Sequence, residues 1–248
     1  ALEPEVIDLV KLLQKMGAII ELGANRDIEI EGVQNLHGAS HSILPDRNEA
    51  ISFACLAIGT GGRIMVRHAK QGHLINFLNV VRKMGGEYEV TKDGIIFWRD
   101  GKLKAVKVET QAHPGFMTDW QQPLVVVMTQ AKGVSEIHET IYEDRFGYVN
   151  DLNEMGANIK TFTDCGNWER CRFSEHGFMH RAVVEGGAEL QGKSLVVRDL
   201  RAGMAHVLAA LIATGESEIS NIEELDRGYE NIDERLKNLG AELKRVSG

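Results

Sequence analysis

Arginine and aspartate side chains recur at corresponding places along this sequence of 248 residues. Arg47 and Arg201 each stand at the start of an apolar, helix-like segment, and Asp119 takes that place in a third one. Arg145 and Arg227 each follow an aspartate and precede a glycine by 11 and 13 residues. A planar guanidinium group binds carboxylates and phosphates through paired hydrogen bonds. If these places are equivalent in a repeated fold, the arginines predict a shared cleft for a small anion.

Two interpretations of the aspartates stay open at this point. Each Asp-Arg pair can be a solvated helix start, where the aspartate offsets the unfavourable position of arginine in the helix dipole. Asp119 can cap the helix predicted over 120–129, with Gln122 reaching back as in a capping box. Alternatively, the stiff His-Pro-Gly loop at 113–115 delivers Asp119 to the helix start so that its carboxylate faces the predicted cleft.

A metal site is weighed and not expected. Cys165, Cys171, His176 and His180 have the order C-x5-C-x4-H-x3-H, in which the gap between the cysteines and the histidines is too short for a zinc finger. Residues 170–174 have the pattern of a strand, which would put Cys171 on one face of a sheet. No G-x-G-x-x-G dinucleotide-binding motif occurs in the sequence, and we expect no cofactor.

The segments that carry these residues form an internal repeat. Gly17, Gly85, Gly156 and Gly240 are 68, 71 and 84 residues apart. Each follows an amphipathic helix-like stretch, as a left-handed helix-ending glycine does. Each also precedes a strand-like run, at 19–22, 87–90, 159–162 and 242–246. Further helices are predicted at 49–58, 120–129 and 200–213, followed by strands at 63–67, 134–141 and 217–222.

Three units of alternating helices and strands therefore occupy residues 45–248. The Asp-Arg pairs at 144–145 and 226–227 are predicted to open the second helix of their units. Residues 1–44 are predicted to be the tail of an earlier lobe, with a helix over 5–16. We predict the boundary at Leu44-Pro45, because the residue before proline is pushed out of the helical region. Repeated units of this size predict an α/β fold with internal pseudo-symmetry.

The composition excludes several classes of function. The chain has 28 Lys and Arg against 36 Asp and Glu, a net charge of −8, which disfavours nucleic-acid binding. No apolar run approaches the roughly 18 residues of a membrane helix, and no signal peptide begins the chain. Three cysteines at irregular spacing predict no disulfide framework and a reducing cytoplasm. Because the first residue is not Met, we expect a mature fragment or a shortened chain.

Five stretches resemble the enolpyruvyl transferase family in order and spacing. They are LPDRNEA at 44–50, HPGFMTDWQ at 113–121, ETIYEDRF at 139–146, DLRA at 199–202 and DRGYE at 226–230. The resemblance implies an α/β (α+β) fold, namely an inside-out α/β barrel lobe of βαβαββ repeats with pseudo-three-fold symmetry. It implies transfer of the enolpyruvyl group of phosphoenolpyruvate to the 3′-hydroxyl of UDP-N-acetylglucosamine, in peptidoglycan precursor synthesis.

The resemblance also implies roles for particular residues. Asp119 matches the carboxylate that contacts the sugar hydroxyl and is proposed as its base, and Ile141 matches a backbone contact to the UDP-sugar. Arginines 145, 201 and 227 match the cationic shell around phosphoenolpyruvate. Asp46, Arg47 and Asp199 match positions near the hinge and cleft.

The resemblance covers only about the last three-fifths of the family's enzymes. The segments for the catalytic loop acid and for most uridine contacts lie outside it, so we expect the isolated chain to be inactive and the missing N-terminal part to be a partner. Some family positions are altered, Trp120 and Gly203 among them. Two alternatives therefore stay open: another acceptor such as shikimate 3-phosphate, or a binding or assembly module without catalysis.

Overall fold

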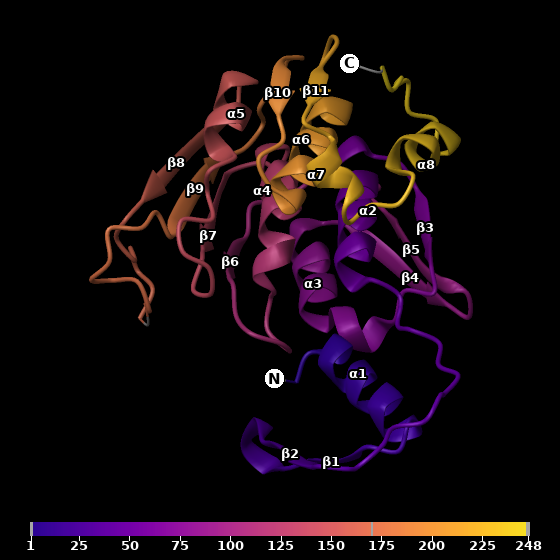
Figure 1. The fold of residues 1–248 in the computed structure, drawn as a ribbon. Helices are drawn as coiled ribbons and strands as arrows, with labels where there is room; N and C mark the ends of the chain where they lie inside the picture. Colours follow the sequence, from indigo (N-terminus) through magenta and orange to yellow (C-terminus); the bar gives the residue numbers. More distant parts are fainter. Residues whose placement is uncertain (1, 170, 247–248) are drawn as a thin grey trace. The chain divides into compact units, whose positions relative to one another are not determined.

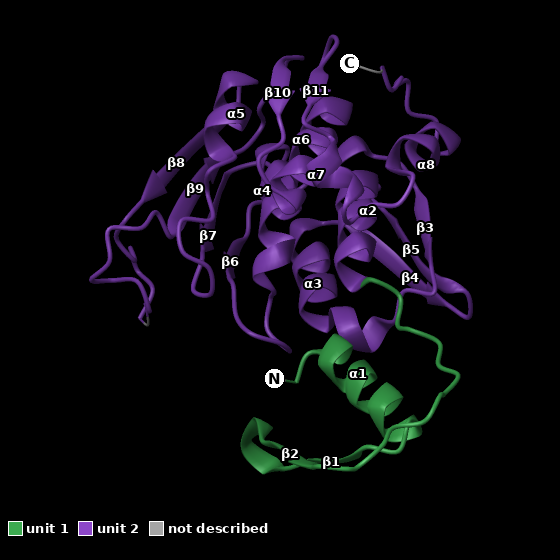
Figure 2. Ribbon diagram, in the orientation of Figure 1, with its two compact units in different colours: residues 1–46 green, residues 47–248 purple. Residues whose placement is uncertain are grey.

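The computed structural model describes residues 2–169 and 171–246. The chain divides into two compact units, residues 1–46 and 47–248 (Figure 2). The division lies two residues after the boundary that the sequence predicts. Unit 1 consists of α1 (Pro4–Lys15), β1 (Ile19–Leu22), the short 3-10 helix η1 (Ala24–Arg26) and β2 (Ile28–Glu31), and β1 pairs with β2 in an antiparallel hairpin.

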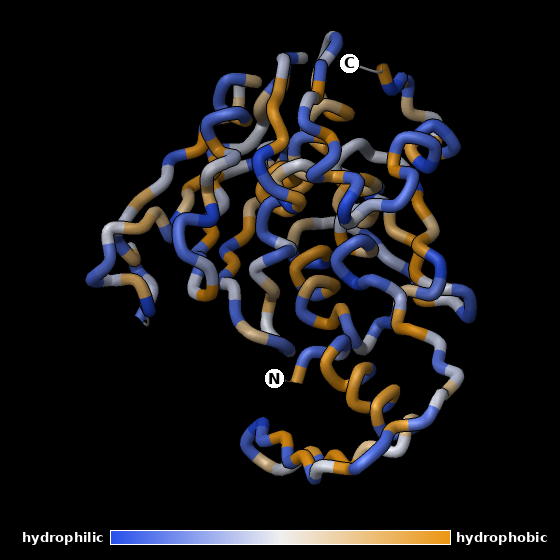
Figure 3. Tube along the Cα trace, viewed as in Figure 1, coloured by the Kyte–Doolittle hydropathy of each residue, from blue (hydrophilic) through white to orange (hydrophobic). Residues whose placement is uncertain are grey.

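Unit 1 exposes an unusual number of apolar side chains for its size. Apolar and polar residues alternate along α1 and the hairpin (Figure 3), but few of the apolar ones are buried. The exposed large apolar residues are Leu2, Leu9, Ile19, Leu22, Ile30, Val33, Leu36 and Ile43. Exposed apolar surface of this kind usually marks an interaction site.

Three buried helices form the centre of unit 2. They are α2 (Arg47–Thr60), α4 (Gln121–Thr129) and α6 (Leu200–Ile212), and each contacts the other two (Figure 1). All nine residues of α4 are buried, as are most of α2 and α6. A helix that is apolar on every side must be enclosed by protein. The three sequence repeats therefore share one core instead of forming three separate ones.

The sheets lie outside these helices, as the family resemblance implies. The first two sheets pack against α2 and α4. In the first sheet the strand order is β3 (Ile64–Arg67), β5 (Gly94–Trp98), β4 (Glu87–Thr91). In the second sheet it is β6 (Lys107–Glu109), β7 (Val134–His138), β9 (Arg181–Glu185), β8 (Asn158–Phe162). The third sheet pairs β10 (Ser194–Val196) with β11 (Glu218–Ser220).

Among the residues that the structure describes, the βαβαββ order is complete only in the middle repeat. There β6, α4, β7, α5 (Val149–Glu154), β8 and β9 follow one another, and α4 connects the parallel strands β6 and β7. The first repeat of unit 2 consists of α2, β3, α3 (Gln71–Met84), β4 and β5. The third ends in α7 (Glu223–Asp226) and α8 (Ile232–Asn238).

The strand predicted at 242–246 is wrong, because the described residues there have no regular structure and no strand partner. Arg245 instead bonds to the Asp226 carboxylate through two nitrogens, at 2.8 and 2.7 Å. The four glycines at the helix ends have φ angles of +87° to +107°, which confirms the predicted left-handed caps. None of the described helices combines the length and the apolar character needed to cross a membrane.

Candidate functional site

The structure brings three of the predicted site residues together. The Asp119 carboxylate accepts a hydrogen bond from Arg145 Nη2 at 2.8 Å through Oδ1, and lies 3.5 Å from Arg201 Nε through Oδ2. Asn48 Nδ2, from α2, donates to Oδ2 at 3.3 Å. The Arg145 and Arg201 side chains are only 13% and 15% exposed, and Asp119 is 30% exposed. Two guanidinium groups and one carboxylate leave a net positive charge at a partly open position.

Asp119 is not a helix cap, so that interpretation is wrong. It lies inside the 3-10 helix η2 (Thr118–Trp120), whose N-cap is Met117, while Trp120 occupies the N-cap position of α4. Gln122 does not reach back to close a capping box: it is buried, and its amide has no partner among the described residues. The carboxylate is thus committed to the arginines and to Asn48.

Every repeat contributes to this cluster. Asn48 comes from the first turn of α2, Asp119 from the approach to α4, and Arg201 from the first turn of α6. The Arg201 guanidinium also donates to the Tyr229 hydroxyl at 3.4 Å, and this hydroxyl lies 2.8 Å from Ser52 Oγ. The equivalent positions of the repeats were predicted to meet at one cleft. Of these, Arg201 and Asp119 do meet.

Arg47 lies beside the cluster as a buried support. Its guanidinium donates to His113 Nδ1 at 3.1 Å and lies 5.7 Å from the centre of the Trp120 ring. The Trp120 indole N–H in turn donates to Asn48 Oδ1 at 2.9 Å. Because both polar atoms of the Asn48 amide are engaged, its orientation toward Asp119 is fixed.

The buried carboxylate of Glu139 organises the segments around the site. It accepts hydrogen bonds from Thr110 Oγ1 at 2.8 Å, from Thr118 Oγ1 at 2.9 Å and from the Ile141 amide at 2.8 Å. It also accepts from the Tyr142 amide at 3.1 Å. Glu139 thus ties the residue before Asp119 to the predicted substrate contact Ile141. One feature of the sequence points to Glu139: it is a carboxylate directly after the buried end of β7.

The two Asp-Arg pairs do not open helices as predicted. Arg145 lies in a turn before α5, where Asp144 has a left-handed φ of 51°, and its guanidinium stacks 4.5 Å from the Tyr142 ring centre. Arg227 ends α7 instead, a position that the helix dipole favours for a cation. Its side chain is 73% exposed and bonds to Glu224 at 2.7 Å. The structure does not bring Arg227 into the cluster, and its ligand role stays a prediction.

The remaining predicted residues occupy less direct places. Asp199 caps α6, accepting from the Arg201 and Ala202 amides at 2.9 and 3.0 Å. It therefore helps to fix the first turn of the helix that carries Arg201. Asp46 is the last residue of unit 1 and is exposed. The Ile141 carbonyl accepts a hydrogen bond from Arg172 Nη1 at 3.4 Å.

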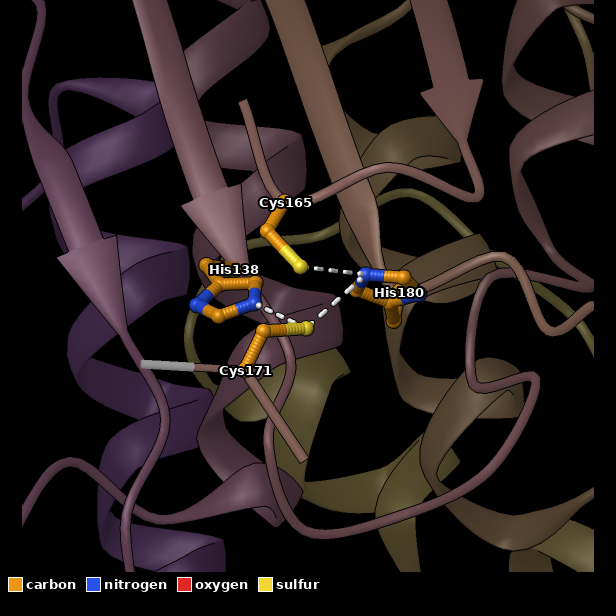
Figure 4. A group of neighbouring side chains, drawn as sticks. All are labelled: His138, Cys165, Cys171 and His180. Atoms are coloured by element: carbon orange, nitrogen blue, oxygen red, sulfur yellow. Dashed lines mark hydrogen bonds between the residues drawn. The ribbon is translucent and has the colours of Figure 1, made fainter. Parts of the chain in front are cut away.

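A second cluster lies at the C-terminal end of β7 and involves His138, which the spacing along the chain does not indicate. His138, Cys165, Cys171 and His180 place one ligand atom each within 4.8 Å of one another (Figure 4). His176 is not part of this group, because its ring is exposed and stacks on Phe178. The strand predicted at 170–174 is also wrong: Cys171 has no regular structure, residues 172–174 form turns, and Arg170 lies outside the described residues.

Comparison with known proteins identifies the family. The model of the EPSP synthase (3-phosphoshikimate 1-carboxyvinyltransferase) family matches residues 1–236. The chain therefore belongs to this family of enolpyruvyl transferases.

The similar curated proteins carry one particular name. UDP-N-acetylglucosamine 1-carboxyvinyltransferase of Protochlamydia amoebophila is 45% identical over 99% of this chain and 53% of its own length. The protein of that name from Chlamydia trachomatis serovar D is 47% identical over 98% of this chain and 55% of its own length. The chain spans about half the length of the curated relatives it matches.

Solved structures agree with the fold. The enolpyruvyl transferase NikO from Streptomyces tendae superposes with a TM-score of 0.80 at 27% identity, over 97% of this chain and 54% of that one. EPSP synthase from Acinetobacter baumannii, at 16% identity and a TM-score of 0.69, supports the fold alone. These matches confirm the α/β fold that the repeat pattern and the resemblance predicted.

Proposed function

We propose that this chain contains, in residues 45–248, the C-terminal lobe of an enzyme that transfers the enolpyruvyl group of phosphoenolpyruvate to the 3′-hydroxyl of UDP-N-acetylglucosamine. The observation that carries the proposal is the Asp119 carboxylate held between the Arg145 and Arg201 guanidinium groups. The names of the relatives at 45–47% identity support the choice of acceptor.

The arginines serve to bind the anion. Phosphoenolpyruvate carries a carboxylate and a phosphate, both of which pair well with guanidinium groups. Arg145 Nε is buried and has no hydrogen-bond partner among the described residues. A donor of this kind is costly when it is left unsatisfied, and an incoming oxyanion would satisfy it.

Asp119 serves the acceptor hydroxyl. Addition of the hydroxyl oxygen to C2 of phosphoenolpyruvate forms a C–O bond, and the hydroxyl proton passes to the Asp119 carboxylate. C3 takes a proton from a general acid, which we place outside this chain. The adduct then loses phosphate from C2 and a proton from C3, which returns to the conjugate base of that general acid, and the double bond is regenerated. With Arg145, Arg201 and Asn48 fixing both carboxylate oxygens, the base is well oriented toward one position.

The experiment measures phosphate release by this chain, alone and combined with the N-terminal half of the Protochlamydia relative. We expect negligible release from the chain alone. We expect release from the combined protein with phosphoenolpyruvate and UDP-N-acetylglucosamine, and none when shikimate 3-phosphate replaces the sugar. Release with shikimate 3-phosphate alone would establish the other acceptor. A stable combined protein that binds neither acceptor nor phosphoenolpyruvate would favour a module without catalysis.

A further inference from the structure

The group of His138, Cys165, Cys171 and His180 has the composition and the spacing of a tetrahedral metal site. His138 Nε2 lies 3.4 Å from Cys171 Sγ, while His180 Nε2 lies 3.1 Å from Cys171 Sγ and 3.6 Å from Cys165 Sγ (Figure 4). Zinc bonds of about 2.3 Å to sulfur and about 2.0–2.1 Å to nitrogen place the ligand atoms of a tetrahedron about 3.4–3.8 Å apart. These three separations are close to the tetrahedral values, and the other pairs of ligand atoms lie no more than 4.8 Å apart.

Both imidazole rings are oriented as metal-bound histidines are. The two Nε2 atoms face the sulfurs, while each Nδ1 has a partner outside the group. His138 Nδ1 lies 3.1 Å from Glu109 Oε2, and His180 Nδ1 lies 2.8 Å from the Phe178 carbonyl oxygen. A partner on the second nitrogen fixes the tautomer that leaves Nε2 free to bind a metal. Both rings are fully buried, so neither is oriented by solvent.

We propose that these four side chains bind one Zn²⁺ ion in a structural site. Two thiolates and two imidazoles in a tetrahedron are the ligand set of structural zinc. Four protein ligands complete the coordination, so no position stays open for a substrate.

The site would fasten the loop between β8 and β9 to the strand ends around it. His138 is the last residue of β7, Cys165 follows β8, and His180 precedes β9. Glu139 follows His138 directly, and its amide donates to the His180 carbonyl at 2.7 Å. An ion at this place therefore also restrains Glu139, which joins the Asp119 and Ile141 segments.

The test measures zinc in the full chain, purified without a histidine tag, kept reduced, incubated with equimolar zinc and desalted. We expect about one zinc ion per chain. Cys171→Ser should lose it, whereas His176→Gln, a change at an exposed histidine of the same loop, should retain it.

Two further readouts keep the test valid if Cys171→Ser does not fold. Cobalt added to the unchanged protein should give the intense visible absorption of a tetrahedral thiolate site. Removal of zinc by a chelator should make two thiols reactive and speed amide exchange at 139–142 severalfold. Cys55 stays unreactive, because its burial in α2 raises the pKa of its thiol. The proposal is overturned if the folded, reduced protein retains no zinc, or if Cys165 and Cys171 form a disulfide under these conditions.

Discussion

Replacing Asp119 by Asn separates catalysis from binding in this site. The amide keeps the size of the carboxylate but cannot accept the hydroxyl proton, so we expect turnover to fall by about 10²–10⁴. The local charge changes at the same time, from two guanidinium groups and one carboxylate to two guanidinium groups alone. Phosphoenolpyruvate should therefore bind at least as tightly as before.

The effect on stability follows from the two contacts. Opposite charges about 4 Å apart interact by about 4 kcal/mol per pair at an effective dielectric constant near 20, before the cost of removing both groups from water is subtracted. Asp119 is 30% exposed and Asn can still accept a hydrogen bond from Arg145, so the net cost should be on the order of 1 kcal/mol.

The assay is phosphate release by the combined protein, with kcat and KM determined separately and unfolding followed in urea. Glu87→Gln is the matched control, since it removes a carboxylate from an ion pair with Arg82 on another surface. The control should lose similar or less stability and no turnover. If Asp119→Asn turns over at nearly the rate of the unchanged protein, Asp119 is not the base and only orients the arginines.

Three further outcomes follow from the structure. Arg145→Lys loses the planar fork beside Asp119 and should weaken phosphoenolpyruvate binding by about 2–5 kcal/mol in a direct titration. An equal loss in Arg227→Lys would show that this exposed side chain leaves Glu224 to contact the ligand. Burial lowers the pKa of His206, so the folded state binds fewer protons than the unfolded state and stability should decrease as the pH falls below about 6.5. Urea titrations should show a slope of at most about 1.4 kcal/mol per pH unit, absent in His206→Gln. Gly59→Ala places a carbon 2.9 Å from Ile212 Cδ1, the movable end of a side chain of α6, and should cost at most about 1 kcal/mol in urea unfolding, whereas Gly72→Ala meets open space and should cost nothing.

The local patterns of the sequence predicted most elements of the fold, because each pattern has a local cause. The three central helices are long apolar runs, and the helix ends are marked by glycines that adopt φ angles few other residues tolerate. The strand at 242–246 failed for a non-local reason. A strand needs a neighbouring strand to pair with, and the alternation of apolar residues does not indicate whether a neighbouring strand is within reach.

The site was predictable where equivalent positions in the repeats converge, as Asp119 and Arg201 do. Arg227 shows the limit of that reasoning, because the turn between α7 and α8 directs its side chain to Glu224. The histidine and cysteine cluster was missed for a related reason. His138 is 27 residues before Cys165 in the sequence, and only the pairing of β7 with β9 brings it beside His180. Spacing along the chain therefore favoured the wrong histidine, His176.

The shared helical centre of unit 2 has a consequence for how sequences of this fold can diverge. A residue inserted into α2, α4 or α6 would rotate every later side chain of that helix by about 100° and disturb all three repeats at once. A residue inserted between β8 and β9 would lengthen a peripheral loop and leave the centre unchanged. Length variation among descendants of a common ancestor should therefore accumulate between the outer strands, and the interior helices should keep a constant length. New binding properties can then arise at the periphery without a cost to folding.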